Sequence, residues 1–287
     1  MYSKTITLAN GAIVPQLALG TWFIDDDKAA DAVKAAATIG YRHFDSAQAY
    51  GNERGVGEGV RSCGIPRDQL FVTTKVAAEH KDYKSAAEGI DESLRKMGLD
   101  YIDMMIIHSP QPWREVNKSD DRYFEGNIEV WRALTDAYKA GKLRAIGVSN
   151  FLKEDIDNLL ENAEVKPMVN QVLCHISNTP LKLIEYCQSK GIVMEAYSPV
   201  AHGEALKNEK IGEMAKKYGV SIPQLCIRYD LQLGMITLPK TANPDHMRSN
   251  ADVDFVIADE DMEILKNIET IKDYGEHSRF PVFGGKY

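Results

Sequence analysis

Residues 71–75 read FVTTK, residues 102–108 read IDMMIIH and residues 143–149 read LRAIGVS. Helical patterns at about 84–97 and 127–140 separate these three apolar runs. Nearly continuous apolar strands that alternate with helices are typical of a parallel sheet whose faces are covered by helices. The stretch therefore predicts an α/β fold built from strand–helix units.

The alternation continues in both directions along the chain. Residues 5–22 begin with two short alternating runs around Asn10-Gly11, a dipeptide that suits a tight hairpin turn. Further strands are expected at 43–46, 168–172, 193–197 and 235–240, and further helices at 28–39, 52–63, 153–162, 180–190, 210–218, 223–232 and from about 243 onward. No linker divides residues 1–287, so we predict a single domain, a (β/α)8 TIM barrel with an N-terminal β-hairpin. A doubly wound open sheet is the structural alternative.

The composition is that of an ordinary globular protein. The chain has 44% hydrophobic and 26% charged residues, and 34 Lys and Arg against 42 Asp and Glu give it a formal charge of −8. This negative charge disfavours nucleic-acid and membrane-surface partners. No apolar run approaches the roughly 18 residues of a membrane helix, and the start MYSKTITL lacks the apolar core of a signal peptide. We therefore expect a cytoplasmic protein.

Metal and dinucleotide-loop motifs are missing from the sequence. The four cysteines form no CxxC pair and the seven histidines form no HExxH motif, so we expect free, buried thiols and no metal site. Gly55, Gly57 and Gly59 do not have the GxGxxG spacing of a dinucleotide-binding loop. Because they lie in a helical pattern, we interpret them as positions of close helix packing.

Polar side chains occupy the expected carboxyl ends of the strands, where barrel enzymes build their sites. Asp45, Tyr50, Lys75 and His108 come from three consecutive strands. A lysine cation held by Asp45 lowers the pKa of a nearby tyrosine, which makes its phenol a better acid. A neutral His108 would orient a substrate oxygen. Together the four residues suit proton transfer to a carbonyl, although each alone is also explained by a solvated lysine, a core histidine or a structural ion pair.

The last strand leads into a second candidate site. Lys240 and Thr241 come just before Asn243-Pro244, a favourable N-cap followed by a favourable first helical residue. Free backbone N–H groups at such a helix start would face an anion. We expect a phosphate here; a capped helix beside a surface lysine is the alternative.

Several separated motifs extend this interpretation along the whole chain. They are GYRHFDSAQAYGNERGVG at 40–57, Lys75 closing FVTTK, YIDMMIIHSP at 101–110, LRAIGVSNF at 143–151, Gln171, EAYSPV at 195–200 and LPKTANPDHMRSN at 238–250. With these motifs the chain resembles the aldo-keto reductases, in particular small microbial members that use NADPH.

The resemblance implies a monomeric barrel that binds NADPH and transfers a hydride to a small-molecule carbonyl substrate. Tyr50 would be the general acid, Lys75 and Asp45 would tune it, and His108 would orient the carbonyl. The implied cofactor contacts are Ser149, Asn150 and Gln171 with the carboxamide, Tyr197 stacked on the nicotinamide, Ser198 with the pyrophosphate, Lys240 and Thr241 with the 2′-phosphate, and Asn250 with the adenine. The implied substrate contacts are Trp22, Tyr50, His108, Ser109 and Trp113.

Two positions depart from the family pattern. The family often has an arginine six residues after the lysine that corresponds to Lys240, where this chain has His246. Arg248 cannot replace it, because two residues turn an ideal helix by about 200°. NADH therefore stays open beside NADPH. Many members also have a tryptophan after the catalytic histidine, where this chain has Ser109, and Trp113 in the long 109–126 loop is a candidate replacement.

Other functions and several substrates remain open. Lys75 could instead form a Schiff base in a barrel aldolase, although Asp45 would oppose the low lysine pKa that this chemistry needs. A non-catalytic regulatory subunit that binds the nicotinamide is the other alternative. The loop at 109–126, the loop after Tyr197 and the tail at 277–287 would choose among methylglyoxal-like dicarbonyls, keto sugars and xenobiotic aldehydes.

Overall fold

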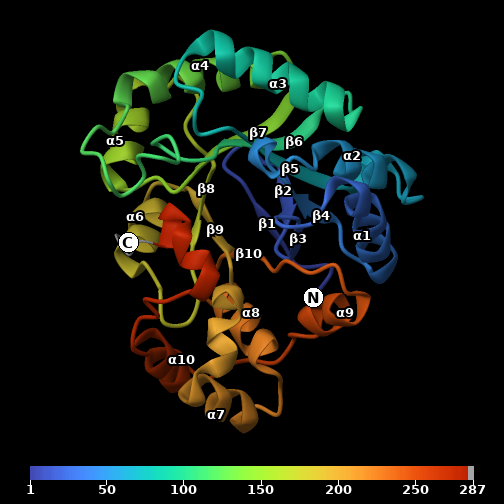
Figure 1. The fold of residues 1–287 in the computed structure, drawn as a ribbon, viewed down its shortest axis with the longest axis vertical. Helices are drawn as coiled ribbons and strands as arrows, with labels where there is room; N and C mark the ends of the chain where they lie inside the picture. Colours follow the sequence, from blue (N-terminus) through green and yellow to red (C-terminus); the bar gives the residue numbers. More distant parts are fainter. Residues whose placement is uncertain (284–287) are drawn as a thin grey trace.

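The computed structural model describes residues 1–283, in which a barrel of parallel strands lies inside a ring of helices (Figure 1). Residues 284–287, the end of the predicted domain and tail, lie outside the described residues. The eight strands are β3 (Ala18–Gly20), β4 (His43–Asp45), β5 (Phe71–Val76), β6 (Ile102–Ile107), β7 (Leu143–Ser149), β8 (Val169–Leu173), β9 (Val193–Tyr197) and β10 (Ile236–Leu238).

Contacts between the first and last strands close the sheet. The strands follow one another around the sheet in chain order, from β3 to β10. Parallel bridges join Leu17 to Thr237 and Gly20 to Lys240, and the Gly20 N–H donates to the Pro239 carbonyl at 3.1 Å. The predicted TIM barrel is thereby confirmed, and the open, doubly wound sheet is excluded.

The predicted N-terminal hairpin is also present. Strands β1 (Thr5–Thr7) and β2 (Ile13–Pro15) pair antiparallel, with Gly11 at φ 85° in the turn between them. The Asn10 side chain donates to the Arg144 carbonyl at 2.8 Å, and His43 contacts the Pro15 carbonyl at 3.2 Å. Because His43 and Arg144 stand at the starts of their strands, the hairpin covers the amino ends and leaves the carboxyl ends open.

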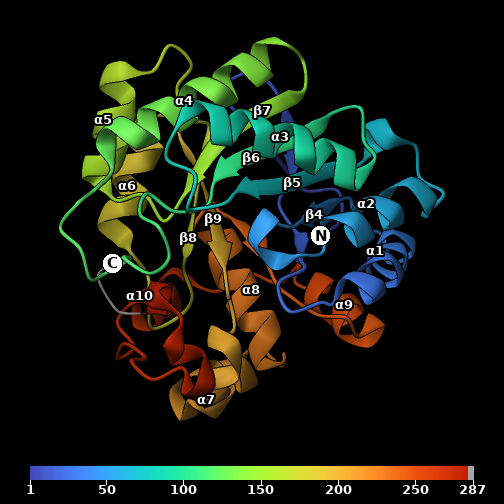
Figure 2. The same ribbon diagram turned by 45° about the horizontal axis from the view of Figure 1, so that its top comes forward.

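The helices surround the strands on the outside (Figures 1 and 2). They are α1 (Asp26–Ile39), α2 (Glu53–Ser62), α3 (Tyr83–Met97), α4 (Phe124–Lys139), α5 (Lys153–Asn162), α6 (Leu181–Ser189), α7 (Glu209–Lys217), α8 (Ile222–Gln232), α9 (Pro244–Ala251) and α10 (Asp259–Lys266). In α2, a Cβ at Gly55 or Gly57 would collide with the backbone of Asp26 or Met97. The interpretation of these glycines as close packing positions is confirmed.

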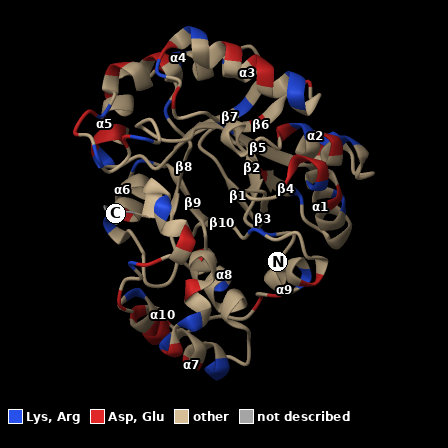
Figure 3. Ribbon diagram, in the orientation of Figure 1, with Lys and Arg blue, Asp and Glu red and all other residues tan. Residues whose placement is uncertain are grey.

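Charged residues lie mainly on these outer helices (Figure 3), whereas no barrel strand holds more than one Asp, Glu, Lys or Arg. Three of the cysteines are buried as expected, but Cys63 is half-buried, and all four are free thiols. No helix among residues 1–283 combines the length and apolar character needed to cross a membrane.

Candidate active site

A cavity of about 770 Å³ opens at the carboxyl ends of the strands. Most of the predicted site residues line it: Trp22, Asp45, Tyr50, His108, Trp113, Ser149, Asn150, Gln171, Tyr197, Ser198, Lys240 and Asn250. The other three, Lys75, Ser109 and Thr241, are buried next to it. Trp22 and Asn250 are 228 positions apart in the sequence, yet both line this cavity. They meet because consecutive parallel strands end on the same side of the barrel.

Lys75 and Asp45 form a buried ion pair between neighbouring strands. The Lys75 Nζ donates to both Asp45 carboxylate oxygens, at 2.6 and 2.8 Å, and to the Ser46 carbonyl at 2.8 Å. Burial lowers the pKa of Lys75, but Asp45 and Tyr50 raise it by more, so the net pKa is raised. The side chain is fully buried, and the Asp45 carboxylate keeps it a cation.

Tyr50 stands beside this cation at the end of a short 3₁₀ turn, Gln48–Tyr50. The Lys75 Nζ lies 4.9 Å from the centroid of the Tyr50 ring. Gln48 anchors the turn, because its side chain donates to the Gly89 carbonyl and accepts from the Ala77 N–H.

The pKa of Tyr50 corrects one expectation. Burial raises this pKa, while Lys75 lowers it and Asp45 raises it, and the net direction is upward. The lysine therefore acts in the predicted sense, but the predicted net lowering is wrong because burial outweighs it. The phenol keeps its proton at neutral pH and is available as a donor.

His108 is buried at the same end of the cavity. Burial first, and then the Lys75 cation, hold the pKa of His108 well below its usual range, so the imidazole is neutral as expected. Its Nδ1 has no hydrogen-bond partner among residues 1–283. The His108 ring centroid lies 5.6 Å from that of Tyr50, which places both side chains within reach of one ligand atom.

Trp113 and Ser109 take different places around His108. The Trp113 ring packs edge-on against the His108 ring, with centroids 4.7 Å apart, and lines the cavity. Ser109 is fully buried, and its hydroxyl accepts from the Gln111 N–H at 3.3 Å. Four of the five predicted substrate contacts, Trp113 among them, line the cavity, and Ser109 does not.

The residues expected at a carboxamide are already linked to one another. Asn150, at φ 61°, donates from its side chain to the His108 carbonyl at 3.0 Å and accepts from the Tyr197 hydroxyl at 2.7 Å. Its amide nitrogen also lies 3.1 Å from the Ser149 hydroxyl. Gln171 donates to Asp45 at 3.0 Å and so connects this group to the ion pair.

The expected phosphate site borders the same cavity, with Lys240 in its wall. Lys240 is exposed there, and Asn243 caps α9 by accepting from the Asp245 N–H at 2.8 Å. The Thr241 hydroxyl accepts from the Asn243 N–H at 3.0 Å. The cap is confirmed, but fewer N–H groups are free than expected, because these two are used and Pro244 has none.

The two other basic residues of this region lie outside the cavity wall. His246 and Arg248 are both exposed, and Arg248 pairs with Asp245 at 3.0 Å. Arg248 is thus occupied elsewhere, as its helical position predicts. Ser198, also in the cavity wall, contacts the His202 ring at 3.2 Å.

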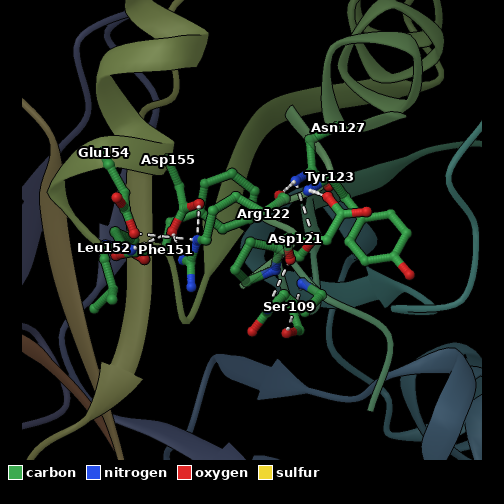
Figure 4. Close-up of polar contacts among 12 residues, drawn as sticks. Ser109, Asp121, Arg122, Tyr123, Asn127, Phe151, Leu152, Glu154 and Asp155 are labelled. Atoms are coloured by element: carbon green, nitrogen blue, oxygen red, sulfur yellow. Dashed lines mark hydrogen bonds and ion pairs between the residues drawn. The ribbon is translucent and has the colours of Figure 1, made fainter. Parts of the chain in front are cut away.

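The long 109–126 loop is tied down at several points (Figure 4). Arg122 forms an ion pair with the buried Asp155 and a second with Glu154 at 3.2 Å. Lys81 donates to the Ser109 carbonyl at 3.0 Å and to Asn127 at 2.9 Å. These contacts hold the loop that carries Trp113.

Sequence reasoning missed four aromatic side chains of the cavity wall. Phe23, His202, His277 and Phe280 all line it, and the Phe280 ring lies 4.9 Å from that of Trp22. The loop after Tyr197 and the tail were expected near the substrate, but neither contains a motif that singles out these positions. A preference for aromatic residues in those two segments was the available signal for all of them except Phe23, whose only signal was its place directly after Trp22.

Comparisons with known proteins agree with this geometry. The model of the aldo/keto reductase family matches residues 16–270. Glyoxal reductase of Bacillus subtilis is 41% identical over 90% of each chain. An aldo-keto reductase from a Medee basin deep-sea metagenome library superposes with a TM-score of 0.86 at 36% identity, over 92% of this chain and 95% of that one. The Bombyx mori aldo-keto reductase, solved in complex with NADP, has a TM-score of 0.84 at 30% identity over 98% of both chains.

Proposed function

This chain belongs to the aldo/keto reductase family, and we propose that it reduces small aldehydes and ketones to alcohols with NADPH. One observation carries the proposal: the buried Asp45–Lys75 pair lies beside the Tyr50 ring, and His108 faces the same end of the cavity. A proton donor and an oxygen-orienting group thus meet at one point.

The chain's own residues move the proton and hold the substrate. Tyr50 donates its proton to the carbonyl oxygen, and the Lys75 cation stabilises the phenolate that results. Neutral His108 donates a hydrogen bond to the same oxygen and so fixes its direction. NADPH, when bound, supplies the hydride to the carbonyl carbon.

The cavity suits an extended dinucleotide. Its wall includes Lys240 and Asn250 as well as Tyr50 and His108. Gln171 and Tyr197 would hold the nicotinamide, Ser198 the pyrophosphate, and Lys240 the 2′-phosphate. NADH is the alternative cofactor, because His246 stands where the family often has an arginine that binds the 2′-phosphate.

The wall around Tyr50 favours a small carbonyl compound. The rings of Trp22, Trp113 and Phe280 line this end of the cavity. These aromatic side chains make the wall beside the two polar groups largely apolar. Together with the glyoxal reductase relative, this wall supports short aldehydes and α-dicarbonyls as the substrate class.

The Schiff-base alternative does not fit Lys75. Its three N–H groups have three acceptors, the two Asp45 oxygens and the Ser46 carbonyl, and the side chain is fully buried. The raised pKa of Lys75 also opposes the neutral amine that must attack a carbonyl. Turnover of a carbonyl substrate would distinguish a reductase from a regulatory, non-catalytic protein that only binds the cofactor.

The test is a titration of the purified chain with NADPH and with NADH, followed by quenching of tryptophan fluorescence. Oxidation of each cofactor is then measured with glyoxal, methylglyoxal, a keto sugar and an aromatic aldehyde. We expect selective NADPH binding and turnover of the dicarbonyls. Tight binding without turnover would favour the regulatory role, and no binding would overturn the proposed function.

A further inference from the structure

Glu195 is a buried carboxyl that the proposed reaction does not use. It lies on β9, in register with Gln171 on β8, and is fully buried. Its Oε2 accepts from the Gln171 Nε2 at 2.9 Å, while its Oε1 has no hydrogen-bond partner among residues 1–283. Burial raises the pKa of Glu195 to about 8. A carboxyl with an unpaired buried oxygen costs stability, so its presence here needs an explanation.

The amide nitrogen of Gln171 is shared between two carboxyl groups. It donates to Asp45 at 3.0 Å and to Glu195 at 2.9 Å. A side-chain amide has two N–H donors, so both are used. Turning the amide over would set its oxygen against the Asp45 carboxylate, which can only accept, and the hydrogen-bond network therefore determines which atom faces which way. Gln171 lines the cavity, where its oxygen is the atom left to meet a ligand.

We propose that Glu195 is a positioning residue that takes the second N–H of Gln171, so that Gln171 offers the nicotinamide carboxamide an acceptor and not a donor. The inference rests on the proposed function, because it places the nicotinamide at Gln171. Asp45 alone would not suffice. Without Glu195, the second N–H of Gln171 would have no acceptor, and Gln171 could turn that donor toward the oxygen of the nicotinamide carboxamide.

The surroundings of Glu195 support this role. The charged groups that face it are Asp45 and Lys75, which already form a pair with each other. No cation is left for Glu195 in the described part of the barrel interior, so the Gln171 amide is its hydrogen-bond partner. Its contact with the site therefore passes through Gln171.

The test compares NADP⁺ with its 3-acetylpyridine analogue, in which a methyl group replaces the carboxamide NH₂. Both ligands keep the carbonyl oxygen, but only NADP⁺ can donate to an acceptor. Dissociation constants are measured by quenching of tryptophan fluorescence. The wild type should bind the analogue about tenfold more weakly, the size of one lost hydrogen bond. Equal binding of the two ligands by the wild type would overturn the inference.

Three variants assign this discrimination to Glu195. Glu195→Met keeps the length of the side chain but removes the acceptor, and should reduce the tenfold ratio to about threefold or less. Glu195→Gln keeps an oxygen opposite Gln171 and should retain the ratio. Met194→Leu changes the neighbouring position, which points to the opposite face of β9, and should also retain it.

The outcomes separate this inference from the proposed function. If Glu195→Met keeps the tenfold ratio, or if Glu195→Gln loses it, Glu195 does not orient Gln171. The Gln variant and the wild type still decide the matter if the Met variant does not fold. Failure of the wild type to bind NADP⁺ or to turn over NADPH would instead contradict the proposed function.

Discussion

The ring of Trp113 stands at 87° to the ring of His108, with 4.7 Å between their centroids. Trp113 comes from a long loop, yet it covers the imidazole that is expected to orient the substrate. The residue directly after His108, Ser109, is fully buried and takes no part in this wall. The aromatic wall beside the histidine is therefore supplied five positions along the chain, from Trp113.

Trp113→Ala should weaken the use of small carbonyl substrates. Loss of the ring opens the cavity beside His108, so the KM for methylglyoxal should rise at least about tenfold. The Kd for NADPH should stay unchanged, because the ring lies at the substrate end. Ser109→Ala is the matched control and should leave both constants as they are. An unchanged KM in Trp113→Ala would remove this residue from the substrate site.

The pH profile of kcat/KM for reduction should show no protonation step of a histidine. Burial and Lys75 hold the pKa of His108 well below its usual range, so it stays neutral from pH 6 upward. Burial raises the pKa of Tyr50 above its ordinary value of about 10, so its proton is lost only in strong alkali. We expect kcat/KM for reduction to be flat between about pH 6 and 7, below the pKa of about 8 that burial gives Glu195. An inflection near the ordinary histidine pKa of about 6.5 would show that a charged His108 takes part.

Lys240→Ala should separate the two cofactors. A lysine on the 2′-phosphate makes a charge-assisted hydrogen bond, so its loss should raise the Kd for NADPH about 10- to 100-fold. NADH lacks this phosphate, and its Kd should change by less than about threefold. Arg248→Ala is the control, because Arg248 pairs with Asp245 and does not line the cavity. Equal losses for both cofactors would contradict the assignment of the 2′-phosphate to Lys240.

Arg122→Met should destabilise the fold by leaving Asp155 buried without its cation. Removing one partner of a buried ion pair costs about 3 to 5 kcal/mol, and urea unfolding measures this loss. Arg132→Met, in an exposed pair with Glu129, should cost less than about 1 kcal/mol.

The loss in Arg122→Met should depend on pH. Burial already raises the pKa of Asp155, and Arg122 lowers it, so the variant raises it further. A carboxyl with a raised pKa in the folded state destabilises that state when ionised, above its unfolded pKa of about 3.9. The difference between variant and wild type should therefore shrink as the pH falls toward 4. A constant difference would mean that Asp155 is not the cause.

Much of the site could be predicted because it follows from strand order. Asp45, Lys75 and His108 end consecutive apolar strands, and parallel strands in a barrel bring such ends together. The helix cap at Asn243 was equally local, since it depends on two adjacent residues. Both features were therefore visible in short stretches of sequence.

Other properties depend on packing that no short stretch contains. The net pKa of Tyr50 depends on how deeply the phenol is buried, which the spacing of Lys75 and Asp45 does not reveal. The link between Gln171 and Glu195 needs the register of two strands. The place of Phe280 in the wall depends on how the tail crosses the barrel, and it follows no periodic pattern.

Single-turnover reduction by Tyr50→Phe tests the central claim most directly. Enzyme saturated with NADPH is mixed with methylglyoxal, and the loss of NADPH absorbance is followed. Without the hydroxyl there is no acid to protonate the carbonyl oxygen, so the rate should fall at least about a hundredfold while the Kd for NADPH stays within about twofold. A rate close to that of the wild type would show that Tyr50 is not the proton donor and would contradict the account.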